Sequence, residues 1–120
     1  MQYLLLIYDT DDAYDALTED GHRAVYAEYG VLNEALRAEG RLLSANQLQP
    51  VSTASTVRIK DGETLVTDGP FAETKETLGG YYLIEAESLD DALAWAARIP
   101  SARFGSVEVR PVVEHPGGGS

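Results

Sequence analysis

The sequence predicts a single α+β domain in which strands alternate with two helices. Two stretches, 18–39 and 88–98, carry apolar residues at helical spacing, and runs rich in strand-forming residues lie before, between and after them. Two further short runs, joined by Asp61-Gly62, predict a β-hairpin between the helices. The predicted order is therefore strand, helix, strand, hairpin, strand, helix, strand.

The first part of the chain supplies a strand and a long helix. Residues 2–8 form a nearly continuous apolar run, which suits a strand covered on both faces, and residues 12–18 form a polar connection. Thr18 is the expected N-cap of the helix, and Gly40 is the expected C′ residue. The apolar stripe of this helix consists of Val25, Tyr29, Leu32 and Leu36.

The middle of the chain is rich in strand patterns. Residues 41–48 predict a second strand, and the hairpin follows at 55–67. Residues 81–87, which begin with two tyrosines, predict the next strand. These strands are separated by short segments that contain proline or glycine, as expected for turns.

The last part of the chain predicts a capped helix and a final strand. Ser88, with Asp91 three residues later, resembles a capping box at the start of this helix. The residues expected to face the sheet are Leu89, Ala92, Leu93 and Ala96, with Trp95 at the edge of the stripe. Residues 107–113 predict the last strand. We expect residues 114–120 to form a flexible tail outside the domain of residues 1–113.

Without the hairpin, this order is βαββαβ, the ferredoxin-like pattern. In that fold the helices cover only one face of the sheet. The first strand is apolar on both faces, so its other face needs a cover. A second copy of the sheet would supply this cover, and the sequence therefore predicts a homodimer.

Composition excludes several functional classes. The chain has 120 residues, a net charge of −11 and no cysteine. The negative charge argues against binding to nucleic acid or to anionic membrane surfaces. The lack of cysteine excludes disulfides and thiolate catalysis and fits a cytoplasmic location. We also expect no signal peptide, no membrane span, no metal and no cofactor, because the corresponding sequence patterns are missing.

One segment carries a specific resemblance. Residues 68–76 read DGPFAETKE and residues 79–82 read GGYY. Asp68-Gly69-Pro70 predicts a tight turn, which we expect Phe71 to anchor to the core. This segment resembles the signature of the DGPF-type members of the YCII-related family. The resemblance implies a ferredoxin-like fold that pairs as a dimeric α+β barrel, and it implies no particular reaction.

His22 and Asp68 are the candidate catalytic residues. An imidazole with a carboxylate partner is a common general acid or base. YCII-related proteins are similar in having a proposed His-Asp pair in a pocket beside the first helix, and His22 fits the histidine of that pair. Asp68 is the candidate for the aspartate. The structural alternative is a solvated histidine at a helix start and an aspartate that caps its own turn.

The remaining candidate site residues are predicted to bind a small molecule. Tyr8 and Tyr82 would present hydroxyl groups, although strand tyrosines are more often packing residues. Glu73 and Lys75, together with Glu76, would form a charged rim, and the alternative for them is a solvated loop. Phe71 is a further candidate binding residue.

Three functional hypotheses follow. The first is a cofactor-free proton-transfer enzyme of isomerase or lyase type, acting on a small cyclic or unsaturated acid or ketone, with Tyr8 as a donor to an oxyanion. The second is a non-catalytic regulatory module. The resemblance supports it, since DGPF-type members resemble partners encoded beside extracytoplasmic-function sigma factors. The third is a protein that only binds a small molecule.

Overall fold

The structure is a computed structural model and describes residues 1–10, 12 and 15–114. Its strands and helices, in chain order, are β1 (Gln2–Asp9), α2 (Glu19–Ala38), β2 (Leu42–Gln47), β3 (Ser55–Lys60), β4 (Glu63–Asp68), β5 (Thr77–Glu85), α3 (Leu89–Ala96) and β6 (Ser106–Pro111). Two short 3-10 helices, η1 (Val51–Thr53) and η2 (Pro100–Arg103), precede β3 and β6. The predicted α+β order is confirmed.

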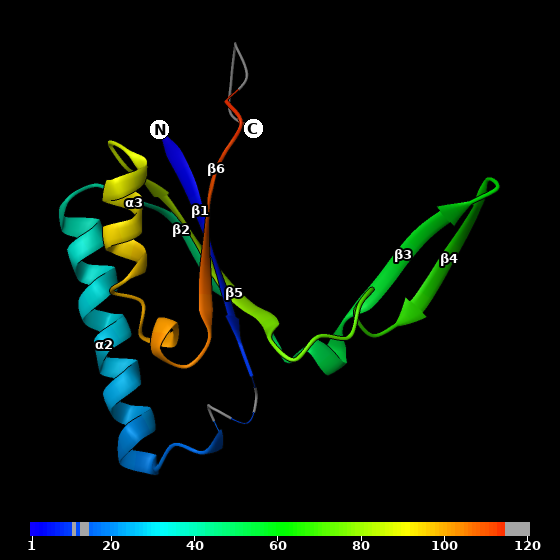
Figure 1. Cartoon of the computed structure of the whole chain (residues 1–120), viewed down its shortest axis with the longest axis horizontal. Helices are drawn as coiled ribbons and strands as arrows, with labels where there is room; N and C mark the ends of the chain where they lie inside the picture. Colours follow the sequence, from blue (N-terminus) through cyan, green and yellow to red (C-terminus); the bar gives the residue numbers. More distant parts are fainter. Residues whose placement is uncertain (11, 13–14, 115–120) are drawn as a thin grey trace.

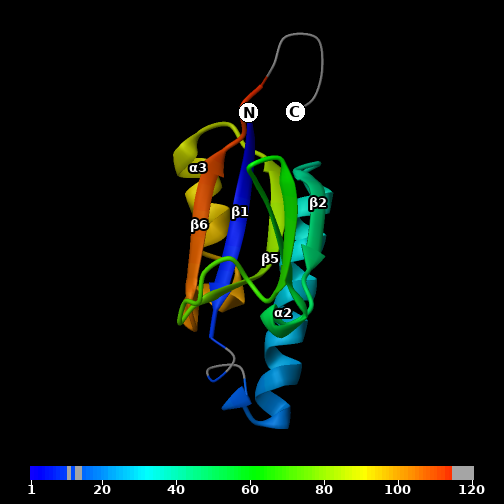
Figure 2. The same ribbon diagram turned by 90° about the vertical axis from the view of Figure 1, so that its right-hand side faces the viewer.

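Four strands form the main sheet in the order β2-β5-β1-β6, and all neighbouring strands are antiparallel. Both α2 and α3 lie on one face of this sheet, and among the described residues no α-helix covers the other face (Figures 1 and 2). This arrangement agrees with the predicted ferredoxin-like fold. Within the described part of the chain, no helix is long and apolar enough to cross a membrane.

The core lies between the sheet and the helices. Along β1 the burial alternates, so that Tyr3, Leu5 and Ile7 are buried on the helix side while Leu4 and Leu6 are half-buried on the other face. The helix stripe predicted at 25–36 also faces this core. Burial of these aliphatic side chains supplies the main stabilising term, about 1.5–3 kcal/mol for each fully buried one.

Local capping signals act as the sequence predicts. The Thr18 hydroxyl oxygen accepts the Gly21 N–H at 3.0 Å at the start of α2. The Ser88 hydroxyl oxygen accepts the Asp91 N–H at 3.1 Å at the start of α3, and the Asp91 carboxylate accepts the Glu87 N–H at 2.9 Å. Each cap satisfies N–H groups that have no partner inside the helix.

The predicted inner face of α3 was wrong in part: Ala92 and Ala96 are buried as predicted, but Leu89 and Leu93 are not. Trp95 is only 6% exposed, whereas Leu89 is 48% and Leu93 45% exposed. Each residue advances about 100° around a helix, so Leu93 points well away from Ala92 while Trp95 remains near the buried face. The small side chains of Ala92 and Ala96 allow the helix to approach the sheet, and the Trp95 ring fills the space beside them.

Two strand boundaries also differ from the prediction. Strand β5 begins at Thr77, four positions before the predicted start, because Gly80 pairs with Ile7 on one side and Gln47 on the other. Strand β6 ends at Pro111 instead of residue 113. The connection predicted at 12–18 is only partly described, and residues 115–120 of the predicted tail, which include His115, lie outside the described residues.

The hairpin β3-β4 forms its own two-stranded sheet and projects on the side of the main sheet that carries no helix (Figure 1). Its two-residue turn has positive φ at Asp61 (51°) and Gly62 (79°), as the sequence predicts. Phe71 follows the hairpin and is 78% exposed, so the expectation that it anchors the turn to the core is wrong for the single chain. The loop leaves the sheet together with the hairpin, which carries Phe71 away from the core.

Candidate functional site

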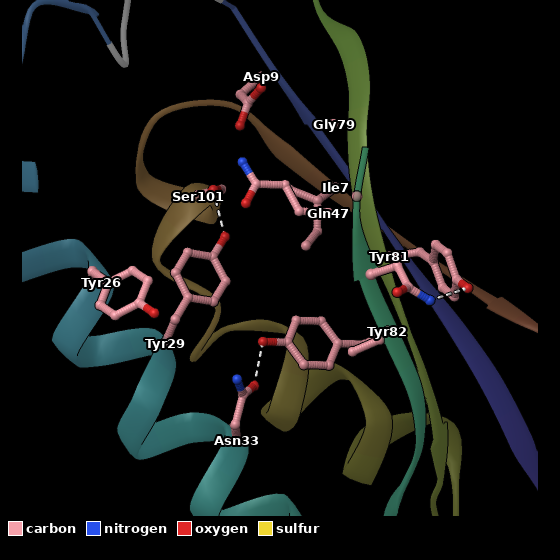
Figure 3. Close-up of a pocket in the computed structure, with 13 residues that line it drawn as sticks. Ile7, Asp9, Tyr26, Tyr29, Asn33, Gln47, Gly79, Tyr81, Tyr82 and Ser101 are labelled. Carbon is pink, nitrogen blue, oxygen red and sulfur yellow. Dashed lines mark hydrogen bonds between the residues drawn. The ribbon is translucent and has the colours of Figure 1, made fainter. Parts of the chain in front are cut away.

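A cavity of about 270 Å³ lies between α2 and one end of the main sheet (Figure 3). Helix α2, strands β1, β2 and β5, and η2 all contribute to its wall. Ile7 and Ala45 supply apolar surface, and most of the other lining side chains are polar. A cavity with this mixture of surfaces is suited to a small organic molecule.

Helix α2 presents three side chains to the cavity, from Tyr26, Tyr29 and Asn33. Their spacing of three and four residues places them on one face of the helix. The Tyr29 hydroxyl group hydrogen-bonds the Ser101 hydroxyl group at 2.7 Å (Figure 3), and Ser101 is only 3% exposed. This bond ties α2 to η2 and fixes the position of the Tyr29 ring.

Tyr82 enters the cavity from the opposite wall. Its hydroxyl group donates to Asn33 Oδ1 at 2.5 Å (Figure 3). Burial, and then the neighbouring Tyr29, raise the pKa of Tyr82 to about 12, although Arg37 and the bond to Asn33 act in the other direction. The phenol therefore stays protonated near neutral pH and can act as a hydrogen-bond donor.

The adjacent Tyr81 points to the other side of the strand (Figure 3). Hydrogen bonds with Ser44 and then Asn46 lower the pKa of Tyr81, and the Asn46 amide donates to its hydroxyl oxygen at 2.8 Å. Two consecutive tyrosines thus have environments that shift their pKa values in opposite directions. Both residues line the cavity, but of the two it is the buried Tyr82 whose ring points into it (Figure 3).

Asp9 lies at the end of β1 and lines the other end of the cavity (Figure 3). Of the described residues around the cavity, it is the one with a charged side chain. Gly79 lies against it, and a Cβ atom at residue 79 would be 3.2 Å from Asp9 Oδ1. At Gly80 a Cβ atom would be 3.0 Å from the Asn46 carbonyl oxygen. The two glycines therefore allow close packing of the strands that form this wall.

This arrangement can bind a ligand by hydrogen bonds and can accept a proton at one carboxylate. It offers a neutral phenol, hydroxyl and amide groups, and the Asp9 side chain. In the described ranges no group of three histidine, aspartate or glutamate side chains gathers as metal ligands.

Among the predicted binding residues, Tyr82 lines the cavity. Tyr8 lies between Ile7 and Asp9, which both line it, so strand alternation places Tyr8 on the other face of the sheet. Phe71, Glu73 and Lys75 are exposed and lie in the loop between β4 and β5. In one chain, the predicted binding residues are therefore not gathered at one site.

The candidate catalytic pair is divided between two elements. His22 is half-buried in the first turns of α2, and Asp68 is the exposed last residue of β4, where it pairs with Ser55. Helix α2 and the hairpin lie on opposite sides of the main sheet (Figure 1). His22 stands four residues before Tyr26, so it shares the face of α2 that lines the cavity.

Asp9, Asn33 and Ser101 line this cavity but were not predicted from the sequence, and Tyr29 was predicted only to pack in the core. The spacing of His22, Tyr26, Tyr29 and Asn33 on one helix face was a usable signal. Asp9 ends an apolar strand, which is a weaker signal. Nothing in the local sequence of Ser101 points to the cavity, because its position depends on how η2 packs.

Comparison with known proteins identifies the family of this chain. The family model of the YCII-related domain matches residues 1–116. An uncharacterised protein of Rhizobium meliloti (strain 1021) is 39% identical over 114 residues, which cover 93% of this chain and 92% of that protein. Since the match extends over nearly the whole sequence, the chain belongs to the YCII-related family.

Proposed function

We propose that this protein binds a small organic molecule in the cavity between α2 and the main sheet. The observation that carries the proposal is the convergence of Tyr29, Tyr82 and Asp9 on one space of about 270 Å³ whose wall combines aromatic, apolar and polar surface. Polar groups that converge in a cavity with aromatic and apolar surface are the usual form of a ligand site. The Tyr82-Asn33 and Tyr29-Ser101 hydrogen bonds hold the two phenols in place before a ligand arrives.

A cavity-filling variant tests this proposal. Ala45→Leu adds three carbon atoms inside the cavity, and Ala24→Leu adds the same atoms on the exposed side of α2. Small organic fragments that bind the wild type in ligand-observed NMR should bind Ala45→Leu at least about tenfold more weakly, which corresponds to roughly 1.4 kcal/mol. They should bind Ala24→Leu as they bind the wild type. Equal binding to all three proteins, or no binding to the wild type, would contradict the proposal.

In a catalytic form of this proposal, the protein transfers a proton to or from the bound molecule, as an isomerase- or lyase-like enzyme without a cofactor. His22 and Asp68 would be its acid-base pair. The position of His22 on the cavity face of α2 supports its role as one member of this pair. Asp68 lies in the hairpin, so it would have to reach the cavity from a second copy of the chain, whereas Asp9 is a carboxylate of the cavity itself.

Isotope exchange tests the catalytic form. A fragment that binds and carries an acidic C–H bond should exchange that hydrogen for deuterium faster with the wild type than without protein. His22→Gln should abolish the acceleration, and Asp68→Asn or Asp9→Asn should show which carboxylate assists. Exchange that the protein does not accelerate, or that His22→Gln leaves unchanged, would restrict the function to binding.

We also propose that the chain acts as a homodimer that buries the uncovered face of the main sheet. The side chains of Leu4, Leu6 and Leu83 lie on this face, with the Arg110-Glu108 ion pair toward its edge. An apolar centre with a charged rim is typical of protein interfaces. This proposal includes the DGPF-type pairing as a dimeric α+β barrel.

The alternative function is a regulatory module linked to an extracytoplasmic-function sigma factor. The exposed apolar side chains of Val57, Ile59 and Val66 on the hairpin support a protein partner. Such a partner would place the protein in the cytoplasm, which its cysteine-free composition fits. A pull-down should recover a sigma factor with the wild type and lose it with Val57→Ser/Ile59→Ser. Recovery of no sigma factor would count against this alternative.

A further inference from the structure

The charges around the cavity restrict the class of ligand. Among the described residues that line it, Asp9 supplies a carboxylate, and no lysine, arginine or histidine side chain contributes to the wall. The whole chain carries a net charge of −11. Its field attracts cations and repels anions as they approach. An anionic ligand would therefore meet a negative protein and a negative cavity end.

The aromatic side chains indicate what kind of body the ligand has. Tyr26, Tyr29 and Tyr82 all line the cavity, and Figure 3 shows their rings around the space beside α2. Tyr26 is 82% exposed, so its ring is available at the entrance and contributes little to the core. The faces of phenol rings pack well against apolar and aromatic groups, so these rings suit the uncharged body of a ligand.

The two ends of the cavity differ in charge. At one end lies the Asp9 carboxylate, with Gln47 on the same side (Figure 3). At the other end Tyr82 donates to Asn33, and Arg37 acts electrostatically on the Tyr82 hydroxyl group. A cation is therefore favoured near Asp9 and disfavoured near Tyr82. The Tyr82 end suits a neutral polar or aromatic group.

We infer that the cavity binds a small organic cation, with its ammonium group at Asp9 and its apolar body between the tyrosine rings. This inference rests on the proposed function, because it names the chemical class of ligand for the same cavity. Gly79 contributes to this selectivity, since a side chain at that position would crowd the Asp9 carboxylate. The inference also predicts that acids are poor ligands.

Three compounds of similar shape test the inference: benzylammonium, benzyl alcohol and benzoate. Their dissociation constants are measured by NMR titration at neutral pH and low salt. The wild type should bind benzylammonium about tenfold more tightly than benzyl alcohol and should bind benzoate most weakly. Asp9→Asn should remove the preference for benzylammonium and retain the binding of benzyl alcohol, which also shows that the variant is folded.

Asp61→Asn is the matched control, because it removes one negative charge at the tip of the hairpin, where asparagine tolerates the positive φ. It should keep the full preference for benzylammonium. If benzyl alcohol or benzoate binds the wild type as tightly as benzylammonium, the inference is overturned and the proposed binding function stands. If none of the three compounds binds, the inference is overturned, and the fragment test with Ala45→Leu decides the proposed binding function separately. If Asp9→Asn does not fold, the order of affinities in the wild type decides.

Discussion

Tyr81 and Tyr82 are neighbours in one strand, but their pKa values shift in opposite directions. The two side chains are identical and adjacent, but strand alternation directs them to opposite faces of the sheet. Tyr82 is buried and donates to Asn33, whereas hydrogen bonds with Ser44 and Asn46 stabilise the phenolate of Tyr81. The buried phenol should therefore be the last of the two to lose its proton.

This difference predicts a stability change at alkaline pH. The pKa of Tyr82 is about 12 in the folded protein, whereas the ordinary value for a tyrosine is 10.0. The unfolded chain therefore releases this proton at a lower pH than the folded protein does. The stabilisation is complete below pH 10 and is lost as the pH rises toward 12, by about 2–3 kcal/mol in total. The Tyr82→Phe variant should not show this pH-dependent loss of stability. Its stability at lower pH should be reduced by about 1 kcal/mol, because the hydrogen bond to Asn33 is missing.

Urea unfolding at a series of alkaline pH values measures the effect. The free energy of unfolding of the wild type should fall more steeply above pH 10 than that of Tyr82→Phe. Tyr26→Phe, at an exposed tyrosine of the same cavity, should follow the wild type. Parallel curves for the wild type and Tyr82→Phe would contradict the assignment of Tyr82 as the buried, neutral phenol.

At the residue scale, the sequence predicted part of the site. Tyr82 was a candidate and lines the cavity, and Tyr8 was an equal candidate on the same grounds but lies on the other face. The sequence could not show which of the two tyrosines faces the cavity. Both strands are apolar on both faces, so strand alternation alone did not reveal which face the helices cover. Asp9 could not be assigned, because its role depends on Gly79 and on the packing of η2.

At the scale of elements, the connection from η2 to β6 depends on one close approach. A Cβ atom at Gly105 would lie 2.1 Å from the Tyr8 carbonyl oxygen, which is backbone. The Ser101 carbonyl group accepts the Gly105 N–H at 2.8 Å and holds this turn against β1. The same turn carries the Ser101 hydroxyl group that positions Tyr29. A change at Gly105 should therefore disturb the fold and the cavity together.

Two glycine-to-alanine substitutions should have opposite effects on stability. Gly105→Ala should lower the free energy of unfolding by roughly 3 kcal/mol, because backbone must move to admit the methyl group. Gly30→Ala, in an exposed part of α2 with no atom within 4 Å of the new Cβ, should raise it by about 1 kcal/mol. Chemical denaturation of the two variants measures both values. Similar effects of the two changes would contradict this packing.

Elements whose signals are local were predictable. The caps of both helices and the Asp61-Gly62 turn depend on residues within one turn of each other, and all three were predicted correctly. The inner face of α3 and the position of Phe71 were not, because each depends on the distance and direction of another element. Trp95 was placed at an edge although it completes the core.

At the scale of the whole molecule, the chain is less compact than a typical monomeric domain. Its radius of gyration is 16.5 Å, against about 14 Å for a compact domain of this length. The hairpin accounts for this difference, since it projects from the body with apolar side chains exposed (Figures 1 and 2). A two-stranded hairpin alone is only marginally stable in water. A second copy that covers the open face of the sheet would also contact this hairpin.

Light scattering should therefore give a mass of twice the chain mass of 13.0 kDa. Leu6→Glu places a charge in the middle of the uncovered face and should yield monomers, because burial of an unpaired carboxylate costs several kcal/mol. Leu93→Glu makes the same change at an exposed position of α3 and should leave the dimer intact. A monomeric wild type, or a dimeric Leu6→Glu protein, would contradict the proposed pairing.

Amide chemical-shift mapping with benzylammonium shows directly where on the protein a ligand binds. The largest shifts should occur at residues that line the cavity, in particular Asn46, Gly79, Gly80 and Ser101. The hairpin strands β3 and β4 should change little. Shifts that cluster on the hairpin or on the uncovered face of the sheet, with none at the cavity, would show that this cavity is not the ligand site.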